Sequence, residues 1–91
     1  MQPVKIERVS GPTITEKGKK AFEAQINVNG MKSKVTCLPL SSAELSEKCA
    51  NAETWAQSMS QVDPKWQDYR VEIVKVQKWF KKYYGVIAYH C

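Results

Sequence analysis

The residues best suited to contact another molecule lie in the C-terminal third of the chain, where lysines and aromatic side chains alternate. If residues 64–84 form a helix, Lys75, Lys78 and Lys82 recur at spacings of three and four and share one stripe. Trp79 then lies at the border between this stripe and the apolar face. Other lysines would extend the surface: Lys81 in the same segment, Lys17, Lys19 and Lys20 in a basic loop, and Lys32 and Lys34 on a strand. Because lysine delivers charge to phosphates and a flanking ring can stack on a base or fill a pocket of a protein partner, we expect a binding surface here.

The same residues are also consistent with a lysine face that is exposed to solvent and has no binding function. Exposed lysine is the commonest way to keep a small domain soluble, and on this interpretation Trp79 completes the core. The two interpretations differ in whether Trp79 lies inside the protein or on its surface.

Cysteine and histidine offer a second kind of chemistry. A Cys₃His zinc site would use Cys37, Cys49, His90 and Cys91. Structural zinc sites usually pair ligands two to four residues apart, whereas here only the adjacent His90 and Cys91 are close in sequence. Cys49 lies on the apolar stripe of a predicted helix, where burial makes a thiol inert. We expect reduced, metal-free cysteines that act as small hydrophobic residues.

Other catalytic and cofactor patterns fail on spacing or on environment. Gly11 and Gly18-Lys19 have the composition of a phosphate-binding loop, but six residues separate the glycines where four are required. A lysine also replaces the hydroxyl residue that would contact magnesium. No acidic residue lies within an apolar run that would raise its pKa for acid–base catalysis. We expect neither an enzyme nor a cofactor.

Size and composition indicate a single domain over residues 1–91, with 43% hydrophobic and 10% aromatic residues. Charges stand near the N-terminus where a signal peptide would need an apolar core, and no apolar run reaches membrane-spanning length. We therefore expect a cytoplasmic protein without a membrane partner. The net charge of +5 comes from two basic segments, 1–40 and 64–91, that flank an acidic one. This pattern is a weak pointer to an anionic partner.

The elements that must position these residues begin with a β-hairpin centred on Asn29-Gly30, the strongest short hairpin signal. The turn sets Val28 opposite Met31, Ile26 opposite Ser33, Ala24 opposite Val35 and Phe22 opposite Cys37 on a largely apolar face. The other face pairs Asn27 with Lys32, Gln25 with Lys34 and Glu23 with Thr36. Because turn geometry and alternation give the same register, we expect strands over about 21–38.

Two further elements flank this hairpin. A first strand should run from Val4 to Val9 and end at Ser10-Gly11-Pro12. After the hairpin, Ser41 and Glu44 form a capping box for a helix that ends near Ser60. Its apolar stripe consists of Leu45, Cys49, Ala52, Ala56 and Met59.

Residues 64–84 are ambiguous between helix and strands. Asp63, Pro64 and Gly85 suit a helix start and end, and the apolar residues Trp66, Tyr69, Ile73, Val76, Phe80 and Tyr83 recur at helical spacing. The run from Tyr69 to Val76 is nevertheless rich in strand formers, although a strand would need a bulge between Ile73 and Val74. We favour the helix, followed by a short strand over 86–89.

The fold class is therefore α+β, in the order β-β-β-α-α-β, with helices packed on one face of a small antiparallel sheet. The fallback order is β-β-β-α-β-β.

The expected function is that of a small, non-enzymatic, basic binding protein that docks on nucleic acid or a nucleoprotein complex. Recognition should be directed at the backbone and not at sequence, because the chain has only two arginines and the polar hairpin face lacks aromatic residues. The alternative is a protein-interaction module, an inhibitor or adaptor, that uses an aromatic hot spot or a sheet edge. By analogy only, such a chain suits an accessory protein of a phage or mobile element.

Overall fold

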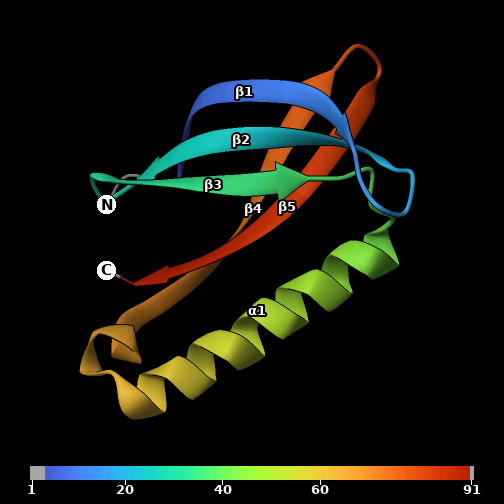
Figure 1. Ribbon diagram of the computed structural model, residues 1–91. Helices are drawn as coiled ribbons and strands as arrows, with labels where there is room; N and C mark the ends of the chain where they lie inside the picture. Colours follow the sequence, from blue (N-terminus) through green and yellow to red (C-terminus); the bar gives the residue numbers. More distant parts are fainter. Residues whose placement is uncertain (1–3, 91) are drawn as a thin grey trace.

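The computed structural model describes residues 4–90 and has the α+β class (Figure 1). Its elements are β1 (Lys5–Ile14), β2 (Lys20–Val28), β3 (Met31–Cys37), α1 (Ser42–Val62), the short 3₁₀ helix η1 (Pro64–Asp68), β4 (Tyr69–Lys78) and β5 (Lys81–His90). The strands form a three-stranded antiparallel sheet in the order β1-β2-β3 and a two-stranded ribbon of β4 and β5. The observed order is thus the fallback, β-β-β-α-β-β.

The β2–β3 hairpin has the register that the sequence predicts, with each of the expected pairs from Phe22↔Cys37 to Val28↔Met31. Asn29 and Gly30 both have positive φ, 53° and 84°, as a type I′ turn requires. The Asn27 side chain supports the turn by accepting a hydrogen bond from the Gly30 N–H at 2.9 Å.

β1 is longer than predicted, because Ser10-Gly11-Pro12 does not end it. The strand lies at the edge of its sheet, where a proline removes no donor that another strand needs. Its register against β2 shifts between Ser10 and Thr13, and Gly11 has a φ of 125° at this irregularity. The basic loop, predicted from Thr13 to Lys20, is correspondingly shorter and covers residues 15–19.

The helix predicted over residues 64–84 is wrong. Beyond η1, this segment forms β4, the turn and the start of β5. The β4–β5 register is continuous, so the strand does not need the bulge between Ile73 and Val74 that counted against it in the sequence. Val74 is buried and Ile73 is 50% exposed, because consecutive side chains of a strand point to opposite faces.

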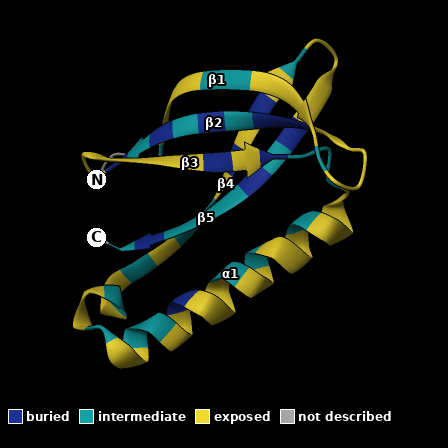
Figure 2. Cartoon of the chain, in the orientation of Figure 1, coloured by how far each residue is buried: buried dark blue, intermediate teal, exposed yellow. Residues whose placement is uncertain are grey.

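The ribbon lies between the three-stranded sheet and α1 (Figures 1 and 2). One face of the ribbon and the apolar face of the β2–β3 hairpin form the core. This core includes Phe22, Ala24, Ile26, Val28, Val35, Cys37, Val74, Val76, Tyr83 and Tyr89. The other face of the ribbon carries the half-buried Val86 and Ala88, which lie near Ala52 and Trp55 of α1. Apolar residues therefore occur on both faces of the ribbon. Their positions in the sequence consequently resemble the spacing of apolar residues in a helix.

The helix α1 begins as the sequence predicts. Ser41 and Glu44 form the reciprocal capping box, with N–H···O distances of 3.0 and 3.2 Å. The predicted apolar stripe is its most buried side, with Ala56 fully buried and the other stripe residues half-buried. The helix extends to Val62, slightly beyond the expected end. It thus covers the ribbon through a narrow row of apolar side chains.

Candidate nucleic-acid interface

The tip of the β4–β5 hairpin presents two aromatic side chains to solvent. Lys78 and Lys81 are the last pair of the ladder, so Trp79 and Phe80 are the two residues of the turn. Trp79 is 92% exposed and Phe80 is 99% exposed. The interpretation that places Trp79 in the core is therefore wrong, as is the expectation that Phe80 lies on an apolar helical face.

The backbone at Trp79 has an uncommon conformation. Its φ is 57°, whereas Phe80 is not among the positive-φ residues. Positive φ at the first turn residue alone is the pattern of a type II′ turn, in which glycine is favoured at that position. A bulky residue there costs on the order of 1–2 kcal/mol. With 92% of Trp79 exposed, packing against residues 4–90 does little to offset this cost.

Lysines surround the tip on both faces of the ribbon. Lys78 and Lys81 pair with each other, while Lys82 pairs with Gln77 and therefore lies on the opposite face, the face that also carries Lys75. The helical stripe of Lys75, Lys78 and Lys82 is thus replaced by two small groups that straddle the ribbon. None of these four lysines has a carboxylate partner among residues 4–90.

The turn end of the ribbon contacts the three-stranded sheet through Phe22. The Phe22 and Tyr83 rings meet edge to face, with centroids 4.7 Å apart. The Lys78 ammonium lies 5.8 Å from the Phe22 ring centroid, within the range of a cation–π contact. These contacts hold the ladder pairs next to the turn, while Trp79 and Phe80 lie beyond them in solvent.

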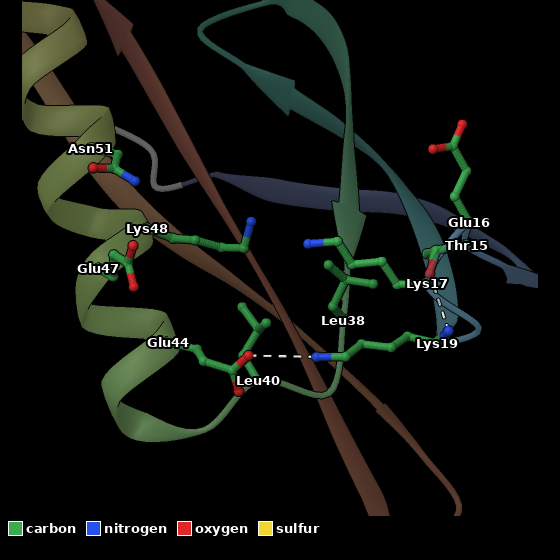
Figure 3. Close-up of a pocket in the computed structure, with 10 residues that line it drawn as sticks. All are labelled: Thr15, Glu16, Lys17, Lys19, Leu38, Leu40, Glu44, Glu47, Lys48 and Asn51. Carbon is green, nitrogen blue, oxygen red and sulfur yellow. Dashed lines mark hydrogen bonds and ion pairs between the residues drawn. The ribbon is translucent and has the colours of Figure 1, made fainter.

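Two of the loop lysines line a separate open groove between the β1–β2 loop and α1, with a volume of about 570 Å³ (Figure 3). Lys17 and Lys48 point their ammonium groups into the groove from opposite sides. Lys19 is paired with Glu44 at 3.5 Å, and this pairing, after the hydrogen bonds from Ser41, lowers the pKa of the Glu44 carboxyl. Sequence reasoning missed Lys48 because it is the single basic residue of the acidic segment, and only the fold brings it to the loop.

The remaining predicted lysines do not join the hairpin tip in one patch. Lys20 is exposed at the start of β2. Lys32 pairs with Asn27, five positions along β2 from Phe22, so it lies toward the other end of the sheet. Lys34 is 3.9 Å from the Glu23 carboxylate across the β2–β3 ladder.

The groups that could perform catalysis or bind a metal are dispersed. Cys37 is buried, which raises its pKa to about 11, and its thiol lies 3.8 Å from the Val74 carbonyl oxygen. Cys49 is half-buried on α1. Within residues 4–90, no three histidine, cysteine or acidic side chains gather as metal ligands would. Cys91 of the considered zinc set lies outside the described residues.

Neither a protein-family model, nor a curated protein, nor a solved structure matches this chain. Among the described residues, α1 is the longest helix, and no helix is both long enough and apolar enough to cross a membrane. The side chains of the hairpin tip and of the surrounding surface are thus the observations from which function is inferred.

Proposed function

We propose that this protein is a small, non-enzymatic binding protein that docks on nucleic acid, free or within a nucleoprotein complex, through the tip of the β4–β5 hairpin. The observation that carries the proposal is the almost complete exposure of Trp79 and Phe80 between Lys78 and Lys81. Burial of a large aromatic side chain stabilises a protein or a complex. Trp79 and Phe80 are not buried by the residues that the structure describes. A negatively charged partner that covers this turn would bury the two rings and form ion pairs with the neighbouring lysines.

The shape of the hairpin suits nucleic acid. A two-stranded ribbon fits the major groove of a duplex, and apolar side chains at a tip can enter a step between two bases. On a single strand, the same rings stack on bases while lysines track the phosphates. The lysines lie on both faces of the ribbon, so phosphates on either side of the inserted tip come within reach.

Recognition by this surface is directed at the backbone. Base-specific readout most often uses arginine on guanine, and the two arginines, Arg8 and Arg70, lie on β1 and at the far end of β4 from the tip. Stacking on a ring is tolerant of sequence because every base has a π face. By analogy, a role as an accessory protein of a phage or mobile element is compatible with this binding mode.

The test is binding to fluorescently labelled single-stranded and duplex DNA across a salt series. Replacing Trp79 and Phe80 together with Ala should weaken binding by at least tenfold, because stacking contributes about 1–3 kcal/mol per base. Trp55→Ala is the matched control, since Trp55 is 51% exposed but lies on α1. A Lys75, Lys78 and Lys82 triple change to Gln should reduce the log–log salt slope by about 2–3 units on duplex DNA.

Two results would contradict the proposal. The first is wild-type protein that binds neither DNA at low salt. The second is unchanged affinity in both hairpin variants while their melting curves match the wild type. If a protein from nuclease-treated extract is retained by the wild type and released by Trp79→Ala, the hairpin is a protein-binding hot spot instead.

A further inference from the structure

A second surface, distinct from the hairpin tip, is the outer edge of β3. In an antiparallel pair, successive residues alternate between bonding the partner strand and pointing their N–H and C=O groups away from it. The two-residue turn makes Val28↔Met31 a bonded pair, so Lys32, Lys34 and Thr36 point their backbone groups away from β2. None of these backbone groups has a hydrogen-bond partner among residues 4–90.

Leu38, the residue after β3, shows that the outward backbone groups of this edge can pair with another strand. It continues the series of outward-pointing residues, and it exchanges two backbone hydrogen bonds with Tyr84 of β5, at 2.9 and 2.7 Å. Had β5 stayed alongside β3, the same pairing would have continued through Thr36, Lys34 and Lys32. Instead, this bridge is isolated, and the two sheets separate from it.

Gly85 permits the close crossing of β3 and β5 at the point where the two sheets separate. A Cβ atom at Gly85 would overlap Val35 Cγ1 and come within 2.8 Å of the Thr36 carbonyl oxygen. β3 therefore crosses closely over the backbone of β5 immediately after the bridge, and β5 passes across β3 without flanking it. The crossing places Gly85 beside the Thr36 carbonyl oxygen. From there back to Lys32, a length of about 13 Å, the β3 edge has no neighbouring strand among residues 4–90.

The space beside this edge is an open groove of about 520 Å³ between β3, β5 and α1. Its apolar lining includes Ala52 and Trp55 of α1 and Val86 and Ala88 of β5. Lys48 and Lys34, the latter 3.9 Å from the Glu23 carboxylate, provide positive charge along its sides, and among residues 4–90 no carboxylate lines the groove. A strand that entered the groove would find free backbone partners on one side and apolar side chains beneath it.

We propose that this groove binds an extended segment of a partner protein in which acidic and small apolar side chains alternate, and that the segment pairs with the β3 edge as an added strand. Alternation places one set of its side chains on Val86 and Trp55 and the other set toward Lys34, while Lys48 lies on the same face of α1 as Trp55. A second copy of this chain is disfavoured as the occupant, because edge-to-edge pairing would bring two sets of edge lysines together. The charge of the groove selects an acidic partner.

The probe is a synthetic eight-residue peptide of alternating Glu and Val, added to ¹⁵N-labelled protein and followed by NMR. The peptide should shift the amide signals of Lys32, Lys34 and Thr36 and slow their hydrogen exchange at least tenfold. The amides of Ser33 and Val35 already bond to β2 and serve as internal controls. A peptide of alternating Lys and Val is the charge control and should leave all of these signals unchanged.

Two variants at Lys34 distinguish the contribution of its backbone N–H to peptide binding from that of its side-chain charge. Lys34→Pro removes an outward N–H that no strand of the chain uses, and should reduce peptide affinity at least tenfold, whereas Lys34→Gln should reduce it only severalfold. Trp79→Ala should have no effect, because the hairpin tip is not part of the groove. The proposal is overturned if millimolar Glu-Val peptide leaves the three edge amides unchanged, if the Lys-Val peptide binds as well, or if Lys34→Pro binds like Lys34→Gln.

Discussion

Replacement of Trp79 with Gly or with Ala should invert the usual order of stability of these two residues. Within a strand or helix, Gly is less stabilising than Ala by about 0.5–1 kcal/mol, because it loses more conformational freedom on folding. At Trp79 the φ of 57° disfavours every residue with a Cβ, by about 1–2 kcal/mol. The difference leaves the Gly variant more stable than the Ala variant by about 0.5–1 kcal/mol.

Loss of the indole ring itself contributes little to this comparison. With the side chain 92% exposed, truncation removes about 20 Å² of buried surface, or roughly 0.5 kcal/mol, and does so equally in both variants. Thermal unfolding followed by circular dichroism should therefore place the melting temperature of the Gly variant about 2–8 °C above that of the Ala variant. Affinity for DNA should fall equally in both, because both lack the ring.

An Ala variant more stable than the Gly variant would show that the turn does not hold Trp79 at positive φ. A loss of more than about 2 kcal/mol in both variants would show that the indole is packed, because truncation of a large buried side chain has this magnitude. Either result would refute the assignment of Trp79 as an exposed residue held in an unfavourable conformation.

Three further predictions concern the scaffold. Gly85→Ala should destabilise the protein by about 1–3 kcal/mol, measured by urea unfolding, because the new methyl group collides with β3; superimposable curves would contradict the close crossing. The pKa of Glu44 is lowered from its ordinary value of 4.5, chiefly by the backbone hydrogen bond from Ser41. The ionised Glu44 carboxylate therefore contributes fully to stability above pH 4.5, and this contribution is lost as the pH falls through the lower pKa of the folded state. The melting-temperature gap between wild type and Glu44→Gln should narrow on acidification, and a constant gap would contradict this. Burial raises the pKa of Cys37 to about 11, so at neutral pH iodoacetamide should modify Cys49 before Cys37, as mass spectrometry of peptides would show. Equal rates at these two thiols would place Cys37 at the surface.

The parts of the fold that the sequence predicted well are those in which local chemistry acts alone. Asn29-Gly30 fixes a turn that few other dipeptides form, and the alternation of the flanking residues agrees with it. The capping box of Ser41 and Glu44 is equally local, since both hydrogen bonds join residues three apart. No tertiary contact is needed to recognise either feature.

The helix was favoured over the β4–β5 ribbon, which was only the fallback prediction, because the signals of the ribbon depend on tertiary structure. Burial against the sheet on one face and against α1 on the other places apolar residues on both faces, so alternation is lost. Its turn contains Trp79 and Phe80 in place of the usual turn residues. The strand formers between Tyr69 and Val76 were the correct signal, and they should have outweighed a helical spacing that includes two residues exposed at the surface.

Two places where this chain departs from local rules are the places that we propose to be functional. In the β2–β3 hairpin and at the start of α1, turn chemistry, alternation and capping agree with the observed fold, and such agreement is what stability alone selects. Stability alone would favour Gly over Trp79 in the turn, and it would favour a sheet continuous from β3 to β5 over an edge left open beside Gly85. Both departures leave groups facing solvent that a fold usually covers, aromatic rings in one case and the backbone donors and acceptors of a strand edge in the other. Each is explained if a partner supplies what the chain leaves out, with nucleic acid covering the rings and an acidic strand completing the sheet.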